Sequence, residues 1–204
     1  MPSNPTPRRP LYHPAADFNQ RIIPATWQPQ RAWFRVHRSG APALGCAIHS
    51  HHRFSHPSSP FPLLYLGATI ATCLWEYFVD DILPGGKRVI SAGKWNGCSL
   101  SRIAVPELKI CAVTQGATRD AMGVDRASLL AEDLGVPQAW GLAVQQHPAA
   151  FQAIKYSSRF IDQACLALFD RAGLAAQLRD TLLGPLSGLD AVVDWLDERK
   201  AALV

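Results

Sequence analysis

Arg35, Glu76 and Ser158 are the side chains of this sequence whose types could do chemistry together. An arginine presents its donors in a planar fork that suits phosphate or carboxylate groups. A carboxylate stabilises positive charge that develops in a transition state, and a buried serine hydroxyl must find a hydrogen-bond partner in the protein or in a ligand. The elements that carry these three residues decide whether they can form one site.

Arg35 and Ser158 fall in two segments that alternate between apolar and polar residues, as β-strands do. Residues 32–38 (AWFRVHR) place Arg35 on one face together with a tryptophan and a histidine. Residues 153–160 (AIKYSSRF) place Ser158 on the apolar, inward face with Tyr156. A salt bridge or a surface position is the structural alternative for Arg35, and an internally satisfied serine is the alternative for Ser158.

Glu76 belongs to the stretch YLGATIATCLWEYFVDD, residues 65–81, which begins as a strand and continues as a helix. The apolar run of residues 62–67 ends at a glycine and predicts a buried strand. From Ala68 onward, apolar residues recur at the period of an amphipathic helix. Glu76 lies off the centre of this apolar stripe, so periodicity alone places it on the solvated face.

The segment HSHHRFSH contains a cluster of histidines, namely His49, His51, His52 and His56. Two of them would share a strand face and could bind a metal ion together with a remote ligand. No cysteine or acid stands nearby and the sequence has no HExxH helix, so a polar loop is the favoured interpretation. The GxGxxG, Walker and GxSxG motifs are also absent from the sequence.

The 204-residue chain has the composition of an ordinary globular domain, with 48% hydrophobic and 18% charged residues. Its net charge is only +4. We find no dense stripe of basic residues of the kind that would indicate binding to nucleic acid. The early chain is basic, which suits an anionic ligand. The cysteines are widely spaced and form no CxxC pair, which is typical of reduced core thiols. Because we find neither a secretory signal nor an apolar run of about 18 residues, we expect a cytoplasmic protein without membrane contact.

Short predicted strands alternate with helices without a regular βαβ rhythm, which indicates the α+β class. Further strands are expected at residues 87–92, 99–105, 108–114 and 164–170, and helices at residues 125–134, 137–147 and 189–203. A turn is expected at the WNG triplet between the first two of these strands. We expect residues 1–30 to form an extended, proline-rich arm, tied down by Leu11, Tyr12 and Phe18. Residues 31–204 then form a single domain that ends in an amphipathic helix.

Short motifs follow one another along the chain in an order that is more specific than any one of them. They are FRVH at 34–37, Arg53-Phe54, LYLGATIATCLWE at 64–76, Trp140, YSSR at 156–159 and ALFDRA at 167–172. On these motifs, residues 33–172 resemble the RES-domain family, which is named for its arginine, glutamate and serine. The members of that family are the toxins of bacterial toxin–antitoxin pairs.

The resemblance implies a single-domain fold similar to that of ADP-ribosyltransferases, with a mixed or antiparallel β core flanked by helices. It also implies that NAD is the substrate and that no metal ion is needed. Arg35 and Arg53 would face the pyrophosphate of NAD, and Tyr65 would line the nicotinamide-ribose pocket. Glu76 would be the catalytic carboxylate, with Arg35 and Ser158 beside it in both catalysis and NAD binding. Glu76 would then lie partly buried in a pocket near Arg35, Arg53 and Ser158.

The group that attacks the ribose carbon decides the reaction, and the sequence leaves it open. Inorganic phosphate as co-substrate would give an NAD phosphorylase, and water would give an NAD glycohydrolase. A protein side chain would give a mono-ADP-ribosyltransferase toxin that modifies a cytoplasmic target. The resemblance further implies a cognate antitoxin, Xre-like and DNA-binding, that holds the protein inactive. A non-catalytic interaction domain is the alternative from another class, but such a domain has no need of Arg35, Arg53, Glu76 and Ser158 together.

Overall fold

The computed structural model describes residues 10–49, 51–82 and 88–204. Part of the predicted arm, residues 1–9, lies outside the described residues, as does the first residue of the strand expected at 87–92.

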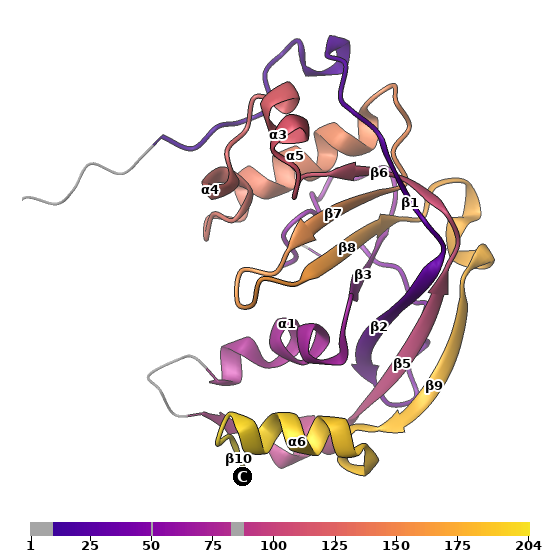
Figure 1. Ribbon diagram of the computed structural model, residues 1–204, viewed down its shortest axis with the longest axis vertical. Coiled ribbons are helices and arrows are strands. Elements are labelled where there is room, and N and C mark those ends of the chain that lie inside the picture. Colours follow the sequence, from indigo (N-terminus) through magenta and orange to yellow (C-terminus); the bar gives the residue numbers. More distant parts are fainter. Residues whose placement is uncertain (1–9, 50, 83–87) are drawn as a thin grey trace, which may run out of the picture.

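The centre of the fold is a mixed sheet. Its strands are β1 (Thr26–Gln28), β2 (Arg31–Arg38), β3 (Leu63–Gly67), β5 (Cys98–Val105), β6 (Leu108–Ala112), β7 (Ala153–Ser157), β8 (Ala164–Phe169) and β9 (Arg179–Pro185). They lie in the order β1-β6-β7-β8-β3-β2-β5-β9. The β6–β7 pair is parallel, and the other neighbouring pairs are antiparallel. The sheet curls strongly along its length (Figure 1), and the predicted mixed β core is confirmed.

Helices gather in two groups around this sheet. They are α1 (Ile70–Ile82), α2 (Ala92–Asn96), α3 (Gly116–Met122), α4 (Arg126–Leu129), α5 (Gly135–Gln146) and α6 (Asp190–Glu198), with 3-10 turns η1 (Phe18–Gln20), η3 (Arg171–Gln177) and η4 (Leu186–Gly188). Strands β4 (Val89–Ile90) and β10 (Ala202–Leu203) form a separate pair. In Figure 1 helices α3, α4 and α5 lie at one end of the molecule and α1 and α6 at the other, with β7 and β8 between them.

Strand β3 and helix α1 follow the predicted patterns. Every residue of β3 except Tyr65 is buried, because the strand lies between β8 and β2 in the middle of the sheet. Helix α1 begins after Thr69, whose Oγ1 accepts a hydrogen bond of 3.1 Å from the backbone N–H of Thr72, a typical N-terminal cap. Its buried stripe, which includes Leu74 and Phe78, joins the hydrophobic cluster formed with β2 and β5. These contacts fix the helix that carries Glu76 against the sheet.

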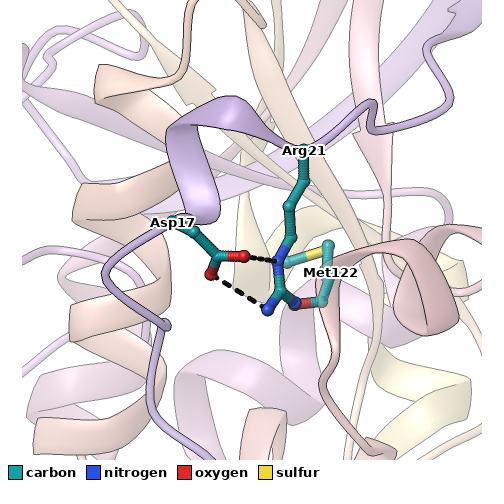
Figure 2. A network of polar contacts seen from close by, with 3 residues as sticks. All are labelled: Asp17, Arg21 and Met122. Atoms are coloured by element: carbon teal, nitrogen blue, oxygen red, sulfur yellow. Dashed lines mark hydrogen bonds and ion pairs between the residues drawn. The ribbon is translucent and has the colours of Figure 1, made fainter.

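A hydrogen bond to helix α3 and an ion pair within the arm hold the described part of the predicted N-terminal arm. Arg21 binds Asp17 through Nη2 at 3.0 Å and donates its Nη1 to the carbonyl oxygen of Met122 at 2.8 Å (Figure 2). The last part of the arm is strand β1, which pairs with β6 at the end of the sheet. This end of the arm is therefore an integral part of the sheet.

Phe18 is the side chain that anchors the arm in the core. Its ring is buried and lies edge-to-face on Trp140, with ring centroids 5.3 Å apart. The side chains of Leu11 and Tyr12 are exposed, so the expectation that they tie down the arm is wrong for the side chains. The backbone of Tyr12 supplies the contact instead, since its carbonyl oxygen accepts a hydrogen bond of 2.7 Å from Trp140 Nε1.

Several elements differ from the sequence prediction. The expected WNG turn is the last part of helix α2, which Ser91 caps by accepting a hydrogen bond from Lys94 N. The helix expected at 125–134 is shortened to α4, and the final helix ends at Glu198, before strand β10. Helix α3 and strands β1 and β9 were not predicted. Strand β9 has exposed residues on both faces, so it lacks the alternation by which an edge strand is found.

Candidate active site

Glu76 and Ser158 are joined by a hydrogen bond. Strand β7 ends at Ser157, three residues earlier than the alternation predicted, and Ser158 is the first residue after it. The Ser158 side chain is only 2% exposed; its Oγ donates to Glu76 Oε1 at 2.5 Å and accepts from the backbone N–H of Phe160 at 3.2 Å. The buried hydroxyl that the sequence left without a partner is therefore satisfied by the carboxylate.

The surroundings of Glu76 act on its carboxyl in opposite directions. Burial raises its pKa, whereas the hydrogen bond from Ser158 and the positive charges of Arg53 and Arg159 lower it, and the net shift is upward. The side chain nevertheless keeps an exposed surface, because it lines a cavity that is open to solvent. Periodicity was therefore right that Glu76 lies on a solvent-accessible side of the helix, and this side borders a cavity.

Arg35 lies in the middle of β2 and is held by backbone carbonyls. Its Nη1 donates to Ala43 O at 2.6 Å and to Gly45 O at 2.9 Å, so the loop after β2 wraps around the guanidinium. Burial lowers the pKa of Arg35, but an arginine remains protonated at neutral pH. No carboxylate of the described residues forms an ion pair with it, so the alternative of a structural salt bridge finds no support among those residues.

Arg53 is likewise held by backbone carbonyl groups, which belong to residues at the end of helix α4 and just after it. Its Nη1 donates to the carbonyl oxygens of Leu129 and Ala131, each at 3.1 Å, next to helix α4. Its positive charge stabilises the Glu76 carboxylate. Both predicted arginines are thus anchored through carbonyl groups, which leaves their charge available to an anionic ligand.

Tyr65 connects β3 with the histidine-containing loop. Its Oη accepts a hydrogen bond of 3.1 Å from the backbone N–H of Phe54, and its ring stacks on His52 with centroids 4.9 Å apart. Burial, followed by the charges of His49 and Arg35, lowers the pKa of His52 to about 4. The imidazole is therefore neutral at physiological pH, although part of its surface is open to the cavity.

A cavity of about 630 Å³ brings most of these groups together. Arg35, Tyr65 and Glu76 line it, with His52 and Tyr156 on its walls. Its volume lies within the range of about 300–1,000 Å³ that is usual for small-molecule sites. Ser158 and Arg53 are not part of the wall, and each acts on the cavity through Glu76.

Comparison with known protein families identifies the family of this chain. The RES domain model matches residues 28–186 of the chain. The chain belongs to the RES domain family. The family resemblance drawn from the motifs is confirmed.

The fold of this RES domain also occurs in a solved toxin–antitoxin structure. A chain of the crystal structure of the M. tuberculosis MbcT–MbcA toxin–antitoxin complex aligns with a TM-score of 0.62 and 18% sequence identity. The alignment covers 87% of the present chain and 93% of that chain. At this identity the likeness concerns the fold, and it confirms a single α+β domain. Comparison with curated proteins gives no match.

Two cavity residues of this RES domain, His52 and Tyr156, were not predicted as site residues. His52 was assigned to a polar loop, and its spacing in the sequence gives no sign that it stacks on Tyr65. Tyr156 could have been found, because it shares the inward face of its strand with Ser158. Within residues 10–49, 51–82 and 88–204, no three His, Cys, Asp or Glu side chains are grouped to hold a metal ion. In the same ranges, no helix has the length and apolar character needed to cross a membrane.

Proposed function

We propose that this RES domain cleaves the bond between nicotinamide and ribose in NAD⁺ and acts as the toxin of a toxin–antitoxin pair. The observation that carries this proposal is the Ser158–Glu76 hydrogen bond at the wall of a cavity that Arg35 and Tyr65 also line. A carboxylate, a guanidinium and an aromatic side chain then face one ligand-sized space, which suits a substrate with an anionic and a planar cationic part.

Glu76 would stabilise the transition state. Loss of nicotinamide leaves positive charge on the ribose ring, as in glycoside hydrolysis. A carboxylate beside that ring, or hydrogen-bonded to its hydroxyls, stabilises the developing charge more than it stabilises the ground state. Ser158 would hold the carboxylate in place and favour its ionised form, because the hydrogen bond lowers the pKa of Glu76.

Arg35 would bind the pyrophosphate from the cavity wall, and Arg53, which lies outside that wall, would add positive charge to the site. Each guanidinium has donors beyond the Nη1 group that the backbone carbonyls occupy. A pyrophosphate carries two negative charges, and charge-assisted hydrogen bonds to arginine are among the strongest that proteins form. Neither arginine needs to move away from a carboxylate first, because none of the described ion pairs involves them.

The acceptor is phosphate or water in the proposed reaction. The basic early chain favours phosphate, which is an anion as well, although NAD⁺ alone also accounts for this charge. Transfer to a protein side chain is the alternative. It is favoured by the open cavity that Glu76 lines, because a bulky acceptor needs access to the reacting carbon.

A protein partner follows from the same proposal. The structure with a similar fold is a complex of the toxin MbcT with the antitoxin MbcA. By analogy, the present chain would bind a cognate antitoxin, an Xre-like DNA-binding protein, and would itself bind neither nucleic acid nor a membrane.

Incubation of the purified protein with ³²P-labelled NAD⁺ separates these reactions. Phosphorolysis yields ADP-ribose phosphate only when inorganic phosphate is present, and hydrolysis yields ADP-ribose without it. Transfer to protein yields a labelled band after addition of cell lysate. NAD⁺ that stays intact under all three conditions would refute the proposed activity.

A further inference from the structure

A second cavity adjoins the candidate site, and none of the residues given a role in the proposed function lines it. Its volume is about 330 Å³, which is sufficient for a nucleoside-sized ligand. Its lining combines the apolar and aromatic residues Phe54, Val113 and Tyr156 with Arg119 of α3 and Arg126 of α4. The first group suits a planar ring and the second an anion.

The two cavities share structure at three points. Tyr156 lines both of them. Ser157, in the wall of the second cavity, directly precedes Ser158, which bonds to Glu76. Leu129 also lines the second cavity, and its carbonyl oxygen holds Arg53. A ligand in the second cavity therefore lies next to the groups that orient the catalytic carboxylate.

The charge of the second cavity favours an anion. Arg119 is fixed by a hydrogen bond of 2.8 Å from its Nη1 to Val113 O. Arg126 lies 3.5 Å from Asp162, and the two side chains are 60% and 88% exposed. Such an exposed ion pair contributes little to stability, so a phosphate can replace Asp162 at the guanidinium. Two arginines against one aspartate leave a net positive charge on the wall.

We infer that the second cavity binds the adenylate half of the dinucleotide, with Arg119 and Arg126 at its phosphate and the adenine ring against the apolar and aromatic residues of the lining. This assignment rests on the proposed function for the identity of the ligand. NAD⁺ is longer than a single ring system, and a site for its adenylate half must adjoin the site for nicotinamide and ribose. The second cavity meets this condition, because Tyr156 lines both cavities.

Calorimetric titration of the full chain with AMP tests the inference without any turnover. We expect wild-type protein to bind AMP, and Arg126→Ala to weaken the affinity about tenfold or more, the usual effect of losing a charged hydrogen bond. The Arg119→Ala variant should behave alike, and Arg126→Lys should retain part of the affinity. Arg102→Ala, which removes an exposed arginine of β5, is the matched control and should bind AMP as wild type does.

Kinetics with two substrates provide an independent test. Nicotinamide mononucleotide lacks the adenylate half, so Arg126→Ala should raise KM for NAD⁺ about tenfold and leave the turnover of the mononucleotide unchanged. Equal losses for both substrates, or AMP binding that Arg126→Ala and Arg119→Ala leave intact, would overturn the assignment, as would wild-type protein that does not bind AMP. If wild type binds AMP through these arginines but releases no nicotinamide, the proposed reaction fails while the nucleotide site remains.

Discussion

Ser158 Oγ lies 2.5 Å from Glu76 Oε1 and donates a hydrogen bond to it, although the two residues are 82 positions apart in the sequence. The end of strand β7 and the middle of helix α1 meet at this bond. It stabilises the ionised carboxylate against the effect of burial, which raises the pKa of Glu76. The hydrogen bond therefore extends to lower pH the range in which the carboxylate is charged.

Replacement of Ser158 by alanine should shift the pH dependence of catalysis. In the proposed reaction the ionised carboxylate is the active form, so activity should be present above the pKa of Glu76 and lost as the pH falls through it. Burial raises the pKa of Glu76 above 4.5, the ordinary value for glutamate, so activity should fall on the acidic side of the pH profile above pH 4.5. Ser158→Ala removes a contact that lowers the pKa of Glu76, so this limb of the pH profile of kcat/KM should move to higher pH, with a loss of activity that grows as the pH falls. An acidic limb at the same pH as in wild type would show that the hydrogen bond does not control ionisation.

The second prediction concerns the stacking of His52 on Tyr65. A neutral imidazole beside Arg35 adds an aromatic surface to the cavity without a second positive charge, which suits the cationic ring of NAD⁺. His52→Ala should raise KM about two- to tenfold, the usual worth of an aromatic contact, and His52→Phe should restore it. His52→Lys should bind NAD⁺ worst, because its charge repels the nicotinamide ring.

His51→Ala is the control for this series, since His51 is exposed in the same loop and does not line the cavity. Equal KM values for the alanine, phenylalanine and lysine variants at position 52 would exclude a contact between His52 and the substrate.

The elements around the site were predictable to different degrees, for physical reasons. Strand β2 and helix α1 were found because one buried side leaves a clear period in the sequence, and strand β3 was found because burial on both faces leaves a continuous apolar run. The inward direction of Ser158 was also correct, as its burial shows. The cavity at Glu76 was not derivable from the period of α1, since that period separates core from non-core and cannot distinguish a concave wall from a convex surface. The anchoring of both arginines by backbone carbonyls leaves no trace in residue types.

Close packing between α5 and the loop that carries Arg53 gives a stability prediction. A Cβ at Gly141 would overlap the backbone carbonyl of Phe54, the residue after Arg53. Gly141→Ala should therefore lower the free energy of unfolding by about 1–3 kcal/mol, as overpacking usually does, and weaken NAD⁺ binding through displacement of Arg53. Urea titration followed by circular dichroism measures the change.

Gly93→Ala serves as the matched control, because Gly93 also lies in a helix and a Cβ there meets nothing closer than 3.7 Å. This variant should be as stable as wild type or slightly more stable, since alanine favours the helix over glycine. A Gly141→Ala variant with unchanged stability would mean that the loop at Phe54 adjusts without cost.

The central claim is that the Glu76 carboxylate stabilises the transition state for cleavage of the nicotinamide–ribose bond. The most direct test is nicotinamide release from NAD⁺ by wild type and Glu76→Gln across a phosphate titration. Glutamine keeps the shape of the side chain and can still accept the hydrogen bond from Ser158. The variant should therefore fold and unfold on heating in a transition of the same shape as that of wild type. The account predicts nicotinamide release by wild type and a rate at least about a hundredfold lower for the variant at every phosphate concentration. A folded Glu76→Gln protein that releases nicotinamide at the wild-type rate would contradict it.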